Sequence, residues 1–146
     1  MSLKVELKPG ERIVVGTAVI RNGDSRARFT IEGEAPILRE RDILTPDTAD
    51  TPARKIYLAV QIMYLDQSPS PQHGLYFALV RDFLQAAPSA LPLISDVNNC
   101  ILSGELYKAL KAVKKLIAYE QELIAHATGG ERIFQGGPGD AVPAGA

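Results

Sequence analysis

The feature that most limits the fold of this chain is one change in its hydrophobic period. Up to about residue 45, apolar and polar side chains alternate, which is typical of half-buried strands. Beyond about residue 51, apolar residues recur every three or four positions, which is typical of amphipathic helices. Strands come first and helices follow without alternation, which argues against a doubly wound sheet and against a barrel of βα units. We therefore predict an α+β fold.

The β region, residues 1–45, is predicted to form a small antiparallel β meander of four or five strands. Residues 3–8 alternate strictly, and Pro9-Gly10 is a turn signal. Asn22-Gly23 is a strong hairpin signal, because both residue types tolerate the positive φ of a type I′ turn. We therefore expect a β-hairpin whose turn is Asn22-Gly23.

The helical region, residues 51–126, is predicted to contain about four helices. Thr51 is a good N-cap and Pro52 suits the first helical position, so the first helix is expected to run from there to about residue 65. Residues 127–146 are rich in Gly, Pro and Ala without apolar periodicity, and we expect a disordered tail. The other helices are expected at 75–86, at 90–102 with Ser89 as N-cap, and at 105–125.

Composition excludes several classes of protein. The 146 residues carry a net charge of -1 and are 46% hydrophobic, unlike a histone-like basic protein or a wholly disordered chain. Cys100 is the only cysteine, so it cannot form an intramolecular disulfide or a Cys-rich zinc site, and His73 and His126 lack spaced ligand partners. No glycine-rich nucleotide motif occurs. We expect no enzyme activity, no cofactor and no metal site. With no long apolar run, we expect neither signal peptide nor membrane span, and a cytoplasmic protein.

Arginines concentrate in the first part of the chain. Seven of the nine arginines precede residue 55, although residues 1–45 carry a net charge of only +1. Guanidinium groups make forked contacts to phosphate and stack on bases, so arginines displayed by a small sheet suit single-stranded RNA. The alternative is that they pair with nearby acidic residues, namely Glu32, Glu34, Glu40 and Asp42. The candidate RNA-binding residues are Arg21, Arg26, Arg28, Arg39, Arg41 and Arg54.

The last predicted helix carries a second basic group. Lys108, Lys111 and Lys115 share the face opposite its apolar stripe. This face is either simply solvated or a rival contact surface for RNA. Tyr57 and Tyr64 lie seven residues apart beside the apolar stripe of the first helix, where they could face a neighbouring helix or a partner.

Five blocks of sequence occur in a fixed order: LKPGER (7–12), AVIRNGD (18–24), ILRERDIL (37–44), TPARKIYLAVQIMYLD (51–66) and GELYKALKAVKKLIAYE (104–120). Together they resemble one family, the flagellar biosynthesis repressors called FlbT, over residues 2–124. This resemblance implies a regulator that associates with the 5′ untranslated region of flagellin mRNA and lowers its translation or stability. Some members are thought to act positively. The family usually operates alongside a second small flagellar regulator, FlaF, and has no catalytic residue or cofactor known to us.

Residues 3–44 contain a short strand, then KPGERIVVG, an Asn-Gly hairpin signal and GEAPILRERDI. This series alone also resembles the carbon-storage regulator family of small β proteins. Members of that family bind GGA-bearing RNA hairpin loops as dimers, through an arginine in the last strand region. Arg39 and Arg41 bracket the comparable place here. The resemblance favours the arginine-bearing strands as the RNA surface.

Two functional hypotheses follow from these observations. The first is a post-transcriptional repressor whose β region holds a flagellin mRNA leader and whose helices dock FlaF or a second copy of the chain. The alternative is a non-enzymatic adaptor in flagellum assembly that binds flagellin or FlaF rather than RNA. Neither hypothesis involves DNA or a membrane.

Overall fold

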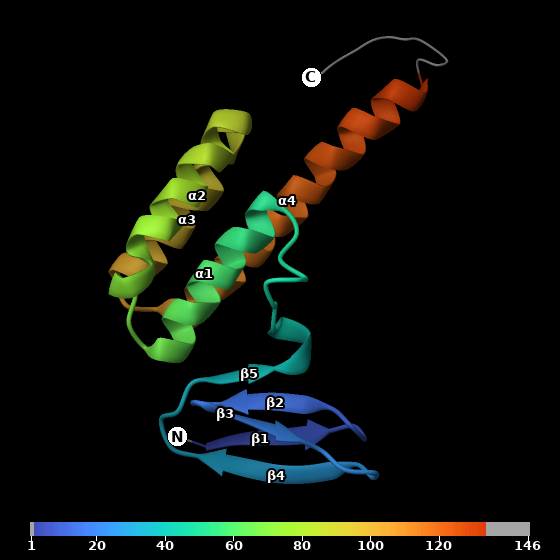
Figure 1. Cartoon of the computed structure of the whole chain (residues 1–146), viewed down its shortest axis with the longest axis vertical. Helices are drawn as coiled ribbons and strands as arrows, with labels where there is room; N and C mark the ends of the chain where they lie inside the picture. The colour runs from blue at the N-terminus through green and yellow to red at the C-terminus, as the bar shows by residue number, and fades with distance from the viewer. Residues whose placement is uncertain (1, 134–146) are drawn as a thin grey trace. The chain divides into compact units, whose positions relative to one another are not determined.

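The computed structural model describes residues 2–133, and its order of elements confirms the predicted α+β class (Figure 1). Antiparallel strands come first and four helices follow. The chain divides between Leu79 and Val80 into two compact units, which are taken in turn. The strands are β1 (Ser2–Leu7), β2 (Arg12–Val15), β3 (Ala18–Arg21), β4 (Ala27–Glu32) and β5 (Ile37–Arg39); the helices are α1 (Pro52–Asp66), α2 (His73–Ala86), α3 (Leu91–Leu102) and α4 (Leu106–Ile133), with short 3-10 turns at Glu40–Asp42, Ser70–Gln72 and Pro88–Ala90.

The strands of the first unit form two antiparallel sheets. One sheet pairs β1 with β4, and the other has the order β3-β2-β5. Among these pairs only β2 and β3 are neighbours in sequence, so the strand order differs from that of a simple meander. The apolar faces of the strands meet in a core of Val5, Leu7 and Ile13, with Val15, Phe29, Ile31 and Ile37 packed against it.

The prediction of a hairpin turn at Asn22-Gly23 is wrong, because the turn of the hairpin lies at Gly16-Thr17. Val15 pairs with Ala18 across this turn, and Gly16 has a φ of 62°, which favours glycine. Neither Asn22 nor Gly23 has a positive φ. The side-chain amide nitrogen of Asn22 instead lies 3.1 Å from the Leu7 carbonyl oxygen and 2.8 Å from that of Lys8. These contacts anchor the chain where it crosses from one sheet to the other, a long-range role that competes with the local turn.

Helix α1 begins as predicted. The Thr51 hydroxyl accepts a hydrogen bond from the Arg54 backbone N–H at 3.2 Å, and Pro52 is the first helical residue. The predicted apolar stripe is buried, with Ile56, Ala59, Val60 and Met63 each at most 1% exposed.

A second stripe of α1 is polar and covers the outer edge of β5. Tyr57, Gln61 and Tyr64 follow the spacing i, i+4, i+7, so they share one side of the helix. The Tyr64 hydroxyl accepts from the Ile37 N–H at 2.9 Å and lies 3.1 Å from the Ile37 carbonyl oxygen. The Gln61 amide binds both backbone groups of Leu44 at 2.9 Å, and the Tyr57 hydroxyl donates to the Asp42 carbonyl at 2.6 Å. Tyr64 therefore faces β5 itself, and Tyr57 faces the segment that follows it.

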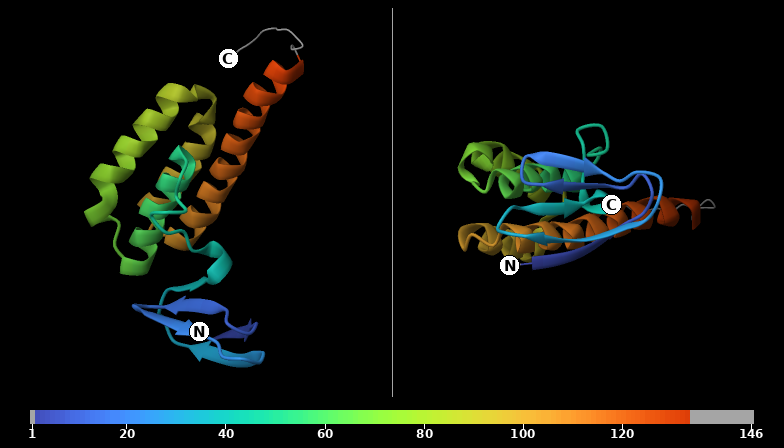
Figure 2. Two further views of the ribbon diagram at one scale, coloured as in Figure 1. Left: turned by 45° about the vertical axis from the view of Figure 1, so that its right-hand side comes forward. Right: turned by 90° about the horizontal axis from the view of Figure 1, so that it is seen from below.

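In the second unit, α3 and α4 pack side by side as a helical hairpin (Figure 2). Gly104, with a φ of 77°, provides the left-handed position that lets the chain reverse between them. The inner faces bury Ile94 and Val97 of α3 against Leu110, Val113 and Leu116 of α4.

Two local predictions for this unit need correction. Ser89 does not cap α3: Ala90 is the N-cap and gives no side-chain hydrogen bond, while the Ser89 hydroxyl is bonded to that of Tyr119. Helix α4 continues to Ile133, beyond the predicted end at residue 125, so residues 127–133 are helical. Once a helix exists, each added residue gains a hydrogen bond, and no proline interrupts the sequence here. The rest of the expected tail, 134–146, lies outside the described residues.

Candidate nucleic-acid interface

Two of the six candidate arginines are held by carboxylates. Arg26 Nη1 lies 3.0 Å from Glu6 Oε2, and Arg54 Nη1 lies 2.9 Å from Asp50 Oδ1. These partners are not the acidic residues expected from sequence. Because these four side chains remain 31–65% exposed, both pairs add little stability, but they reduce the positive charge available to a ligand.

The other four candidates form no salt bridge with any residue between 2 and 133. Arg21 ends β3, Arg28 points outward from β4, and Arg39 ends β5. Arg41 lies in the short 3-10 turn that follows. All are exposed except Arg39, which is half-buried. The alternative that acidic neighbours neutralise the arginines therefore does not account for these four.

Arg28 and Arg39 meet at one open depression of about 480 Å3. On the outer face of the β1–β4 sheet, Lys4 stands opposite Thr30 and Glu6 opposite Arg28. With Val5 and Phe29 these residues complete the lining. Three cations against one carboxylate give the depression a net charge of +2. An open, basic hollow with some apolar surface can hold phosphates and an unstacked base.

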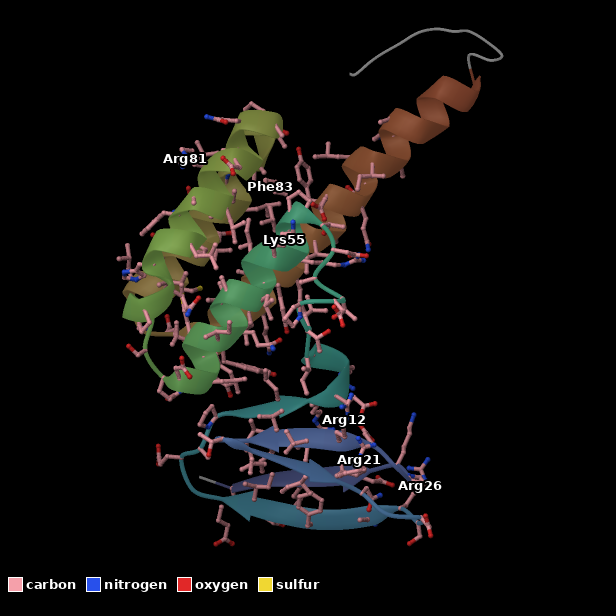
Figure 3. The ribbon with its side chains drawn as sticks, in the orientation of Figure 1. Arg12, Arg21, Arg26, Lys55, Arg81 and Phe83 are labelled. Carbon is pink, nitrogen blue, oxygen red and sulfur yellow. The ribbon has the colours of Figure 1, made fainter. Side chains whose placement is uncertain are left out.

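A second group lies at one end of the strands, where Figure 3 shows Arg12, Arg21 and Arg26 close to one another. Arg12 and Arg21 are cross-strand partners, and two like charges placed directly opposite each other destabilise a strand pair. Glu40 relieves it: its Oε1 accepts from the Arg12 backbone N–H at 2.9 Å and from Nε at 3.2 Å. These bonds from Arg12, with the nearby charge of Arg21, hold the pKa of Glu40 below its ordinary value. Arg12 is paired with Glu40 and Arg26 with Glu6, so the positive charge of Arg21 remains.

Sequence reasoning missed Lys4 and Arg12 as members of these groups. A hairpin turn at Gly16-Thr17 would have placed Arg12 opposite Arg21, but Asn22-Gly23 was the stronger local signal. Lys4 could be associated with Arg28 only through the pairing of β1 with β4, which local patterns do not specify.

Arg41 lies apart from both groups. It lines a separate depression of about 450 Å3 with Lys8, Glu11, Glu40 and the Pro9-Gly10 turn. Two cations face two carboxylates there, and Glu11 already accepts the Lys8 backbone N–H at 2.8 Å. This depression has no excess of positive charge.

The lysine face of α4 forms a third basic surface, in the second unit. Lys108, Lys111 and Lys115 line a hollow of about 230 Å3 with Leu93, Asp96, Cys100 and Ala112. Lys108 is paired with Glu105 at 2.8 Å, and the Lys111 ammonium lies 5.0 Å from the centroid of the Tyr107 ring. Two of the three lysines are therefore already engaged.

No group of three or more His, Cys, Asp or Glu side chains within residues 2–133 could hold a metal ion. No helix in the same range is long and apolar enough to cross a membrane. His73 lies beside the Phe77 ring, with centroids 5.8 Å apart, and Cys100 is a free thiol.

Comparisons with known proteins agree on one family. The family model described as "Flagellar protein FlbT" matches residues 3–124. A relative from Bradyrhizobium diazoefficiens, named "Probable flagellum biosynthesis repressor protein FlbT 1", is 63% identical over 124 residues, 84% of this chain and 85% of that one. The "Flagellum biosynthesis repressor protein FlbT" of Caulobacter vibrioides is 39% identical over 133 residues, 89% of this chain and 94% of that one.

A further relative, from Rhodopseudomonas palustris, is 50% identical over 125 residues, 86% of this chain and 99% of that one. No solved structure matches the chain. The family match spans both units, from β1 through most of α4. The three relatives named above are 39–63% identical to this chain over most of their own length. The chain therefore belongs to the FlbT family of flagellar proteins.

Proposed function

We propose that this protein is a non-enzymatic, cytoplasmic repressor of flagellin synthesis that binds the 5′ untranslated region of flagellin mRNA. The repressor part rests on the names of the relatives, which are flagellum biosynthesis repressors. The RNA part rests on one observation: Arg28, Arg39 and Lys4 surround a single open depression with an excess of positive charge. Bound RNA would be blocked from the ribosome or left exposed to cellular nucleases.

The chemistry of the depression suits RNA held at a few points. Arg28 and Arg39 can each fork to a phosphate, while the half-buried Phe29 offers apolar surface to a base. Binding of single strands releases counterions in proportion to the phosphates neutralised. With about three cations engaged, the logarithm of the affinity should fall with the logarithm of salt concentration with a slope of about -2. A shallow slope distinguishes this mode from a broad positive field.

A filter-binding titration with a flagellin leader RNA tests the proposal. Replacing Arg28 and Arg39 by Ala together should weaken binding by about ten- to a thousandfold, because each removes charge-assisted hydrogen bonds. The matched control is Lys55→Ala with Arg81→Ala, which removes the same charge from exposed positions outside the depression (Figure 3). Equal affinities for the two double variants would refute the assignment of the site. The triple replacement of Lys108, Lys111 and Lys115 by Ala tests the rival lysine surface separately.

The adaptor function remains a second candidate because the second unit exposes large apolar side chains. Leu102 is 83% exposed, Leu91 54% and Tyr107 44%. Such side chains suit a protein partner such as flagellin or FlaF. A partner captured from nuclease-treated extract by the wild type but not by Leu102→Ser, together with no specific RNA affinity, would favour the adaptor.

A further inference from the structure

The two edges of the three-stranded sheet are treated differently by the rest of the chain. At the β5 edge, the Tyr64 hydroxyl is hydrogen-bonded to both backbone groups of Ile37. In the segment that follows β5, Gln61 and Tyr57 bind further backbone groups. At the other edge, β3 is hydrogen-bonded to β2 alone. An exposed strand edge is a template for pairing with another strand.

Strand β3 is short and carries one charge, Arg21 at its end, but its first three residues offer no further protection of the edge. All four of its residues are exposed, and Val19 and Ile20 are 62% and 42% exposed. The run Ala18-Val19-Ile20 contains no charge, no proline and no bulge. Two β-branched side chains on opposite faces of one strand are thus left in water. Residues of this type fit a pleated surface that is at least half-buried, which another strand at this edge would provide.

The direction of the unpaired backbone groups follows from the pairing with β2. Asn22 donates its N–H to the Glu11 carbonyl at 2.8 Å, so it faces β2. Because alternate residues of a strand direct their backbone groups to opposite sides, Ala18 and Ile20 also face β2, whereas Val19 and Arg21 face the free edge. No hydrogen bond among the described residues involves the backbone groups of Val19 or Arg21 outside the sheet.

We propose that β3 pairs in antiparallel register with β3 of a second copy of this chain, about a two-fold axis through Val19. In this register the two Val19 residues exchange both backbone hydrogen bonds, and Arg21 pairs with Thr17 of the second copy. Ile20 then stands beside Ala18 of the second copy, apolar against apolar. The two residues of each pair lie on the same face of the sheet, so the two three-stranded sheets join into one sheet of six strands.

A second copy is the occupant that this edge fits best. In this register the free backbone groups of both strands point toward one another. A two-fold axis generates the same register, so the same strand provides the hydrogen-bonding groups on each side of the contact. The two Arg21 side chains are displaced along the strands to opposite ends of the pair, which avoids a direct clash of like charges. Four residues from each copy form a small contact, below the size typical of permanent dimers. The dimer should therefore be weak and should dissociate on dilution.

Disulfide trapping tests the register. In a Cys100→Ser background, Val19→Cys places two cysteines opposite each other, where paired Cα atoms about 5.5 Å apart allow a disulfide. Mild oxidation should give covalent dimers of this variant in high yield. Arg21→Cys alone is the matched control and should give few, whereas Arg21→Cys with Thr17→Cys should give many. Equal yields for Val19→Cys and Arg21→Cys would overturn the register.

Sedimentation of the full chain tests the association itself. The wild type should shift from monomer to dimer as its concentration rises from micromolar toward millimolar values. Val19→Lys should remain monomeric over the same range, and Leu102→Lys, which introduces the same charge at an exposed apolar position of α3, should behave as the wild type. Circular dichroism confirms that each variant is folded. A wild type that stays monomeric throughout, or a dimer that Val19→Lys leaves intact, would refute the proposal, which is independent of RNA binding.

Discussion

Gln61 provides the sharpest test of how the β region is joined to α1. Its amide nitrogen donates to the Leu44 carbonyl and its amide oxygen accepts from the Leu44 N–H, both at 2.9 Å. The side chain is only 6% exposed. Replacing Gln61 by Met keeps nearly the same volume and flexibility, so loss of packing contributes little. What the change removes is the pair of hydrogen bonds, leaving two backbone groups of Leu44 without partners.

The expected cost can be worked from this geometry. Each hydrogen bond contributes about 1 kcal/mol net, and a buried backbone group left unpaired costs about 1–3 kcal/mol. Since Leu44 is half-buried and water can reach part of its backbone, we expect the free energy of unfolding to fall by about 2–4 kcal/mol. For a unit of this size that corresponds to a lower Tm by about 10–20 °C.

Urea denaturation of Gln61→Met, with amide exchange at Leu44 as a local readout, measures this loss. The matched control is Gln121→Met, the same substitution at an exposed position of α4, which should change stability by less than about 0.5 kcal/mol. Exchange at Leu44 should be accelerated only in Gln61→Met. If the two variants are equally stable and the Leu44 amide stays protected in both, the reasoning fails.

Three further outcomes are expected. Gly16→Ala should destabilise the first unit by about 1–2 kcal/mol, because Gly16 has a φ of 62°. Gly23→Ala should have no such effect, because Gly23 has no positive φ and has open space around it. Thermal melts of the two variants test this difference. Thr51→Ala should lower stability by about 1 kcal/mol through loss of the α1 cap, whereas Thr51→Ser should retain it, and equal melting of both would exclude the capping role. Because the pKa of Glu40 is lowered, its stabilising effect is present above its ordinary value of 4.5 and is lost as pH falls through the lowered pKa. The Arg12 Nε–H resonance should therefore shift in acid in the wild type and stay constant in Glu40→Gln.

The parts of the fold that sequence predicted are those determined by local interactions. Thr51 and Pro52 define the start of α1 because a cap needs only residues within one turn. The apolar stripe with Ile56 and Val60 predicted a buried face for the same reason. By contrast, Asn22 has a local preference for a turn, yet its amide is engaged by carbonyls fourteen and fifteen residues away. No local sequence pattern shows that these distant hydrogen bonds outweigh the preference of Asn22 for a turn.

The candidate site was predicted only in part, again for a physical reason. Arginine content identified Arg28 and Arg39 individually, but their common depression depends on which strands pair, since they lie in different sheets. The same dependence hid the role of Tyr64. Its spacing from Tyr57 was visible, whereas its partner, the outer edge of β5, exists only once β2 and β5 have paired.

The two edges of the β3-β2-β5 sheet connect the proposals. Side chains of α1 occupy the β5 edge, so any strand added to this sheet must arrive at β3. Arg12 and Arg21 lie on one face beside that edge, and Arg12 is paired with Glu40. Pairing at β3 would bring the corresponding groups of two copies onto one continuous sheet and double the number of phosphates within reach. Because the salt slope counts those phosphates, it should steepen above the concentration at which the chain dimerises, and Val19→Lys should remove the steepening while retaining the shallow slope of the monomer. A slope that is independent of concentration in the wild type would show that the two surfaces act separately.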